Sequence, residues 1–94
     1  MDKMINNSNP DEMLKASKKI TAYAENLKKD MKKLLQTHQG MHSCWSGRQY
    51  DDFTRVIEET DREIQKQTDK LLQIASDVES DARQLKIALA QKLG

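Results

Sequence analysis

Three side chains near the middle of the chain, His38, His42 and Cys44, belong to the residue types that bind zinc in proteins. Their spacing gives such a site little support, because there is no Cys-x-x-Cys pair and the two histidines do not fall within one regular helix. We expect His38 to end a helix and Cys44 to be a small buried or half-buried residue. The sequence therefore predicts no bound metal and no other cofactor.

Catalysis is not expected either. An enzyme needs a pocket in which reactive groups converge. The chain has only three glycines, no glycine-rich phosphate loop and no pattern that pairs a nucleophile with a base. The sequence therefore indicates a protein that is not an enzyme.

Two lysine-rich runs, KASKK and KKDMKK, raise the question of nucleic-acid binding. On a helix, the lysines of the second run flank Met31 and form a solvated face, which is the commoner origin of such runs. No aromatic residue lies among them to stack on bases, and the net charge of the chain is only +1. Binding to nucleic acid is therefore not expected.

The composition favours a small protein that needs a partner. The 94 residues suffice for one domain, and apolar residues make up only 36% of them, below the usual roughly 45–50% of globular domains. Such a chain buries a stripe rather than a thick core. No apolar run is long enough for a signal peptide or a membrane span. We expect no membrane insertion and, if the protein leaves the cell, no cleavable signal peptide.

The sequence predicts two helices, which position the histidines, the cysteine and the lysines named above. Asn9 can cap the first, Pro10 suits its first position, and Gly40 is a natural stop, which predicts a helix over about residues 10–39. Its apolar seam has the heptad spacing of a helix that lies along another helix. The seam consists of Met13, Ser17, Ile20, Ala24, Leu27, Met31, Leu34 and His38.

A second apolar series predicts a helix over about residues 47–93. It consists of Tyr50, Phe53, Ile57, Ile64, Leu71, Ile74, Val78, Ala82, Leu85 and Leu89. No β-strand pattern occurs anywhere in the chain. We therefore expect a single all-α domain over residues 1–94, an antiparallel two-helix hairpin with its turn at about residues 40–46.

The run WSGRQY at the turn reads as the start of the second helix. Ser46 as the cap and Gln49 three residues later form a capping box, and Trp45 with Tyr50 forms a hydrophobic staple. Gly47, which lacks a Cβ atom, is expected to let the first helix come close to the indole ring.

Folding back at this turn sets Leu34 near Phe53 and Met13 near Ile74 or Ala75. The last turns of the second helix then have no helix of their own chain to lie against, and Met4 and Ile5 are expected to cover only part of them. Such an uncovered stripe marks an interaction surface. The predicted partner interface consists of Tyr50, Phe53, Val78, Ala82, Leu85 and Leu89.

Two helices of this length, joined by a short turn with Trp-x-Gly, resemble the WXG family of early secretory antigen target-like proteins of type VII secretion systems. The match is Trp45-Ser46-Gly47 in the turn, followed by Phe53 two turns into the second helix. The resemblance implies homodimers or heterodimers, commonly four-helix bundles. It also implies a protein that is cytoplasmic before export and is either a secreted substrate or an escort that pairs with the helical leader of a larger toxin and presents it to the secretion machinery.

The chain departs from this family in one respect. Many members carry a Tyr followed four residues later by Asp or Glu near the C-terminus, which serves as an export signal. Here no aromatic residue follows Phe53, and Tyr50 is followed at that spacing by Thr54. Either a partner supplies the signal or this protein uses another one, which favours an escort. A cytosolic coiled-coil adaptor or regulator, in which Trp45 only staples the turn, is the alternative.

Overall fold

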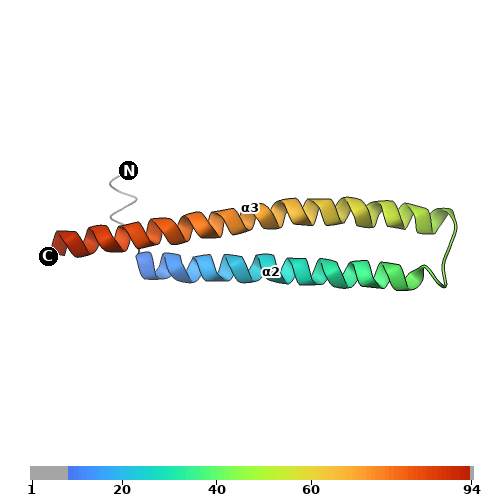
Figure 1. The fold of residues 1–94 in the computed structure, drawn as a ribbon, viewed down its shortest axis with the longest axis horizontal. Helices are drawn as coiled ribbons and strands as arrows, with labels where there is room; N and C mark the ends of the chain where they lie inside the picture. The colour runs from blue at the N-terminus through green and yellow to red at the C-terminus, as the bar shows by residue number, and fades with distance from the viewer. Residues whose placement is uncertain (1–8, 94) are drawn as a thin grey trace. The chain divides into compact units, whose positions relative to one another are not determined.

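The computed structural model describes residues 9–93 and contains two helices joined by a corner (Figure 1). Helix α2 spans Pro10–Met41 and helix α3 spans Arg48–Leu93. Within residues 9–93 there is no strand. The predicted all-α hairpin is confirmed, while the expectation for Met4 and Ile5 lies outside the described residues.

Both ends of the corner lie slightly later in the chain than predicted. Helix α2 continues through Gly40 and ends at Met41, and α3 begins at Arg48. The start of α2 is as predicted. The Asn9 Oδ1 atom accepts hydrogen bonds from the backbone N–H groups of Asp11, at 3.0 Å, and Glu12, at 3.3 Å. Asn9 thereby satisfies two of the N–H groups that have no partner at the start of a helix.

The contacts of the chain divide it into two compact units, and each unit holds a stretch of both helices. Unit 1 comprises Met1–Ala22 and Leu71–Gly94, and unit 2 comprises Tyr23–Lys70.

Small residues line the contact between the helices in unit 1. The buried Ser17 hydroxyl donates a hydrogen bond to the carbonyl oxygen of Ala75 at 2.8 Å, and the Ala82 side chain is fully buried. At the start of α2, the Asp11 carboxylate forms an ion pair with Lys86 at 2.8 Å. Because Ser and Ala are short, the two backbones approach closely enough for a side chain of one helix to reach the main chain of the other.

In unit 2 the contact between the helices is formed by Ala24 and Thr68, both fully buried, together with Met31 and Ile57, which are nearly so. The Thr68 hydroxyl donates a hydrogen bond to the carbonyl oxygen of Gln65 at 3.1 Å. This local bond satisfies a polar group that would otherwise be costly to bury.

The pairing of the helices differs from the predicted register by one helical turn. Ser17, rather than Met13, lies against Ala75 in unit 1, and His38, rather than Leu34, lies against Phe53 in unit 2. The reason lies in the corner. Because α2 continues to Met41, the middle of the corner moves along the chain, and every residue of α2 faces a residue about one turn further along α3.

Neither helix contains, within residues 9–93, an apolar stretch long enough to cross a membrane.

Candidate functional site: the Trp-x-Gly corner

The backbone of the corner is held by hydrogen bonds to the last turn of α2. The N–H groups of Cys44 and Trp45 both donate to the carbonyl oxygen of Met41, at 3.1 and 2.9 Å. The Ser43 hydroxyl donates to the carbonyl oxygen of Gly40 at 3.1 Å. These bonds occupy carbonyl groups that lack a partner at the end of a helix, and they fix the place where the chain leaves α2.

Gly47 occupies the cap position of α3. Its φ angle is +104°, and its carbonyl oxygen accepts the first helical hydrogen bond, from the N–H of Asp51 at 3.0 Å. Side chains other than glycine rarely adopt such a φ angle. A Cβ atom added at Gly47 would meet nothing within 4 Å. The expectation that Gly47 makes room for the first helix was therefore wrong, because the residue is needed for its backbone angle.

The predicted capping box is also corrected. The cap of α3 falls on Gly47 instead of Ser46, because the positive φ angle turns the chain one residue later than expected. Within residues 9–93, no hydrogen bond joins the Ser46 side chain to Gln49, and both residues are exposed. The start of α3 therefore depends on the conformation of a glycine.

The Trp45 ring packs on the first two turns of α3. Its centroid lies 5.7 Å from that of Tyr50, in an edge-to-face arrangement, and 5.9 Å from that of Phe53. Edge-to-face pairs at this separation stabilise by about 0.5–1.5 kcal/mol beyond the burial of their area. The predicted contact between Trp45 and Tyr50 is thus present, and Trp45 sets the angle at which the chain enters α3.

His38 extends this aromatic cluster onto α2. Its ring stacks on Tyr50, with centroids 5.0 Å apart and planes within 4°, and meets the edge of Phe53 at 5.5 Å. The Tyr50 hydroxyl donates to the carbonyl oxygen of His38 at 3.2 Å. We define the aromatic corner as His38, His42, Trp45, Tyr50 and Phe53.

A polar link joins the two helices within the aromatic corner. The His38 Nε2 atom lies 2.7 Å from the Thr54 hydroxyl, which donates to the carbonyl oxygen of Tyr50 at 3.0 Å. A hydroxyl has one proton to give. When that proton goes to Tyr50, an N–H at His38 Nε2 donates to Thr54; the roles depend on the ring tautomer.

Sequence reasoning missed this link. His38 was considered as a seam residue, a helix end and a metal ligand, and Thr54 was named only as the residue at the position of the export signal after Tyr50. The available signal was the position of Thr54, four residues after Tyr50 and hence on the same side of α3.

The proposed zinc ligands do not converge in the structure. His38 faces Tyr50 and Thr54, while the Cys44 side chain is exposed and lies 3.5 Å from the carbonyl oxygen of Met41. The expectation of a buried or half-buried Cys44 was wrong, because Cys44 lies in the corner beyond the end of α2. Within the described part of the chain, no three His, Cys, Asp or Glu side chains form a group that could hold a metal ion. The absence of a bound metal stays a prediction.

The predicted partner residues lie in different surroundings. Two of them are buried by contacts within the hairpin itself, since Tyr50 is only 7% exposed and Ala82 is 0% exposed. Ala82 is covered because α2 reaches one turn further along α3 than expected. Phe53, Val78 and Leu85 are half-buried, and Leu89 is 40% exposed. These four retain surface for a partner.

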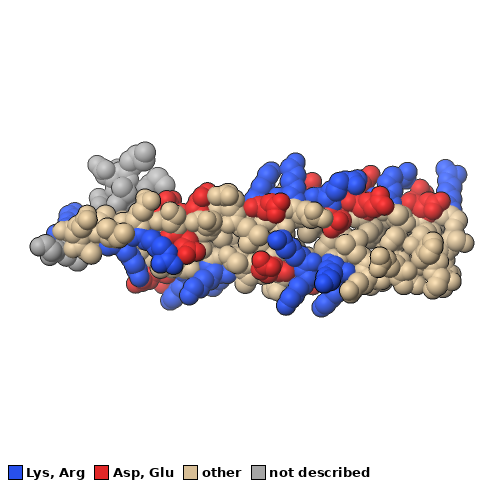
Figure 2. Space-filling model, in the orientation of Figure 1, with Lys and Arg blue, Asp and Glu red and all other residues tan. Residues whose placement is uncertain are grey.

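The surface around the corner carries few charges. Residues 34–47 contain no Lys, Arg, Asp or Glu. Figure 2 shows a tan area without charged side chains over the end of α2 and the corner, bordered along α3 by charged side chains. The arrangement suits recognition by another protein and holds no set of reactive groups.

The fold and the corner together define the class: an all-α helical hairpin in which a tryptophan and a glycine set the turn. The family model described as "Proteins of 100 residues with WXG" (WXG100) matches residues 7–88, and the chain belongs to this family. No curated protein and no solved structure matches the chain. Family membership makes it a small helical protein associated with type VII secretion, in a family of helical partner proteins rather than enzymes.

Proposed function

We propose that this protein acts as a small helical escort in type VII secretion, pairing with a second helical hairpin or with the helical leader of a larger secreted toxin. It is cytoplasmic before export and is recognised by the secretion machinery as part of that pair. Export of the chain as a substrate in its own right is the nearest variant of this proposal.

One observation carries the proposal: each helix has an apolar flank beside its buried positions. On α2 the residues of the hairpin contact recur every seven positions at Ser17, Ala24, Met31 and His38. Four residues before each of them stands an apolar side chain, namely Met13, Ile20, Leu27 and Leu34. On α3 the contact positions Thr68, Ala75 and Ala82, which Asp61 precedes by one heptad, stand four residues after Ile64, Leu71 and Val78, and Leu85 continues this apolar series.

The two flanks lie on the same side of each helix pair. Two antiparallel helices that lie side by side are related by a twofold axis. This axis places the flank that lies four residues before the contact positions of one helix on the same side of the pair as the corresponding flank of the other helix. In unit 1 this side presents Met13 and Ile20 beside Leu71, Val78 and Leu85. In unit 2 it presents Leu27 and Leu34 beside Ile64. We call these residues the apolar side.

The opposite flank is mixed. Four residues after the contact positions stand Thr21, Lys28 and Leu35 on α2 and Gln65, Leu72, Glu79 and Lys86 on α3. Most residues of the apolar side are only half-buried, and Leu34 is exposed. Burying a Leu or Ile side chain fully stabilises by about 1.5–3 kcal/mol. A second helix pair laid on the apolar side would therefore complete a four-helix bundle, which favours a dimer as the working form.

The test is co-expression with the products of neighbouring genes, followed by affinity purification and an export assay. We expect one neighbouring helical protein to purify with this chain in fixed ratio, and the pair to reach the culture medium only when the export ATPase is present. A chain that pairs with none of these products and stays in the cells in both strains would favour the cytosolic adaptor. A chain that is exported alone would favour the substrate.

A further inference from the structure

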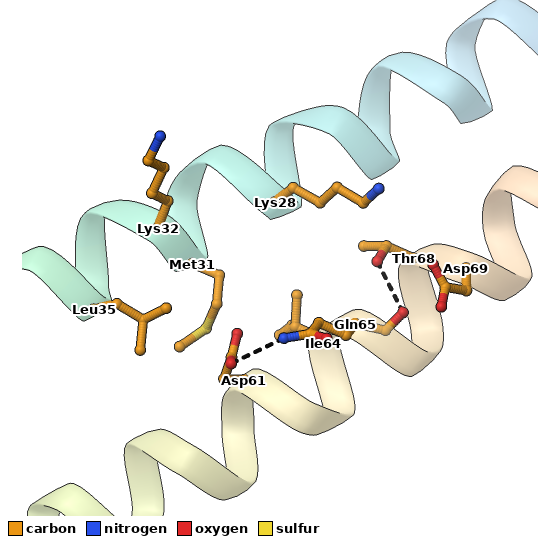
Figure 3. Close-up of a pocket in the computed structure, with 9 residues that line it drawn as sticks. All are labelled: Lys28, Met31, Lys32, Leu35, Asp61, Ile64, Gln65, Thr68 and Asp69. Carbon is orange, nitrogen blue, oxygen red and sulfur yellow. Dashed lines mark hydrogen bonds between the residues drawn. The ribbon is translucent and has the colours of Figure 1, made fainter.

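A groove of about 360 Å³ runs between α2 and α3 in unit 2, away from the aromatic corner. Figure 3 shows its lining residues, with Met31, Leu35 and Ile64 forming an apolar floor. The volume lies near the lower end of the roughly 300–1,000 Å³ usual for ligand sites. It is therefore suited to a few side chains rather than to a large ligand.

The groove arises from the side chains at the helix contact. Asp61 and Thr68 occupy positions of α3 that would face α2 in a regular seam, and neither fills the space as a leucine would. Asp61 is half-buried, and its carboxylate accepts a hydrogen bond from the Gln65 amide at 3.0 Å. The carboxylate is therefore turned along its own helix, and the space in front of Met31 stays open.

The two walls of the groove have opposite charge. Lys28 and Lys32 stand on α2, and Asp61 and Asp69 stand on α3. In Figure 3, Lys28 extends from α2 toward Thr68 and Asp69. No ion pair joins the two walls within residues 9–93. Each wall is therefore available for a group of the opposite charge.

The groove opens on the mixed flank of unit 2, opposite the apolar side. Lys28, Leu35 and Gln65 belong to the flank that follows the contact positions, and neither Leu27 nor Leu34 lines the groove. Ile64 is shared, since it belongs to the apolar side and also forms part of the groove floor. A partner on the apolar side would leave the charged walls free, so the groove is a second surface that meets the apolar side at Ile64.

The charges and the shape of the groove indicate which kind of molecule binds in it. A phosphate-containing ligand is disfavoured because the aspartate wall would repel it. A second copy of this chain is disfavoured because two grooves facing each other would leave an empty space. The two lysines stand one helical turn apart and the two aspartates two turns apart, so a third helix lying in the groove can place charged side chains at matching intervals. A helix also satisfies its own backbone hydrogen bonds, for which the groove offers few partners.

We propose that the groove binds an amphipathic helix of a partner protein. The apolar stripe of this helix packs on Met31, Leu35 and Ile64. Acidic side chains along one edge of the helix meet Lys28 and Lys32, and basic side chains along its other edge meet Asp61 and Asp69. One hairpin then holds one partner on its apolar side and a second helix in the groove.

The experiment uses a fluorescently labelled synthetic helix with a leucine stripe, glutamates along one edge and lysines along the other. Binding to the full chain is followed by fluorescence polarisation. The double variant Lys28→Glu/Lys32→Glu should bind about tenfold more weakly, since two attractive contacts become repulsive. The matched control Lys29→Glu/Lys33→Glu makes the same charge change at the same spacing on the outer face of α2 and should bind like the parent.

Two further arms make the result specific. Gln65→Trp, at an exposed position, should fill the groove and abolish binding while circular dichroism shows unchanged helicity. A second peptide with lysines along both edges should bind the Lys28→Glu/Lys32→Glu variant better than it binds the parent.

Equal weakening by the two double variants, or undiminished binding to Gln65→Trp, would overturn the proposal. Light scattering on the same variants measures assembly through the apolar side. Loss of peptide binding with intact assembly concerns the groove alone, whereas loss of assembly concerns the proposed escort function.

Discussion

Two glycines near the corner have opposite conformational roles. Gly47 has a φ angle of +104°, whereas Gly40 lies within the last turn of α2, and a Cβ atom at either position meets nothing within 4 Å. Gly47→Ala should therefore destabilise the fold by about 1–2 kcal/mol through backbone strain alone. Gly40→Ala should stabilise it by about 0.5–1 kcal/mol, because alanine loses less conformational freedom in a helix.

Thermal or urea unfolding followed by circular dichroism measures both changes. Equal effects of the two substitutions would show that close packing, rather than the backbone angle, explains the glycine of the Trp-x-Gly step.

Trp45 can act on the fold or on a partner, and the two roles are separable. Trp45→Ala removes the ring contacts to Tyr50 and Phe53. For a half-buried ring we expect a loss of about 2–3 kcal/mol, less than the roughly 3–5 kcal/mol of a fully packed aromatic side chain. Trp45→Phe, which keeps a ring against Tyr50, should recover most of this stability.

If Trp45→Phe melts like the parent but fails in partner binding or export, the indole itself is recognised. Unchanged stability, binding and export in Trp45→Ala would contradict both roles.

The ion pair at the start of α2 predicts an acid titration that can be measured at one residue. The Lys86 ammonium donates a hydrogen bond to the Asp11 carboxylate and attracts its charge, which lowers the pKa of Asp11 below its ordinary value. The ion pair therefore contributes stability above the unfolded pKa of about 3.9, and this contribution is lost as the pH falls through the lower folded pKa.

Carboxyl NMR should show Asp11 titrating at lower pH in the parent than in Lys86→Gln. The control Lys92→Gln, further along α3, should leave the titration unchanged. The same titration curve in the parent and in Lys86→Gln would mean that the pair does not persist in solution.

At the scale of the helices, the hydrogen bond from Ser17 to Ala75 fixes how α2 lies along α3 in unit 1. It is buried and joins a side chain of one helix to the main chain of the other at 2.8 Å. Ser17→Ala keeps the close approach but removes the bond, and should cost about 1 kcal/mol in urea unfolding. Ser76→Ala, an exposed position on α3, is the control and should change little. If the two substitutions cost the same, the bond does not contribute to the pairing.

The sequence was sufficient to predict the helices but not their register. Met13 and Ser17 both belong to the same heptad seam, as do Leu34 and His38, so a shift of one turn keeps the seam facing α3. The choice between the two registers depends on side-chain size. Ser17 and Ala24, being small, take the positions of closest approach, and Met13 and Leu27 are left on the flank. A pattern of apolar and polar residues does not contain this distinction.

The corner shows the same limit. The types of its residues predicted a helix start stapled by Trp45 and Tyr50, and that contact is present. The cap, however, depends on the φ angle of Gly47, and the link from His38 to Thr54 depends on the register. The φ angle of Gly47 is a backbone property that residue spacing does not specify. The spacing of Thr54 after Tyr50 indicates that they share a side of α3, but the pairing with His38 is decided where the two helices meet.

For the whole protein, the decisive question is whether the apolar side is an interface. Val78 and Leu85 lie on it in unit 1, whereas Ile87, which is 59% exposed, lies on the outer face of α3. Replacing Val78 and Leu85 with Asp places two charges where a partner would bury methyl groups, so association should weaken about a hundredfold or more. The corner lies in unit 2, so the contacts of Trp45 should persist and its fluorescence should be unchanged.

Ile87→Asp, which makes the same kind of apolar-to-acidic change away from the apolar side, should leave association intact. Light scattering and sedimentation over a range of protein concentrations measure the effect, alone and with the co-purifying partner. A stable and fully helical monomer at high micromolar concentration, forming no complex with any neighbouring gene product, would contradict the proposed interface. If Ile87→Asp weakened association as much as the Val78 and Leu85 substitutions, the interface would not lie on the apolar side. A bundle buries Val78 and Leu85 on one side of α3, whereas a non-specific aggregate does not distinguish that side from the outer face.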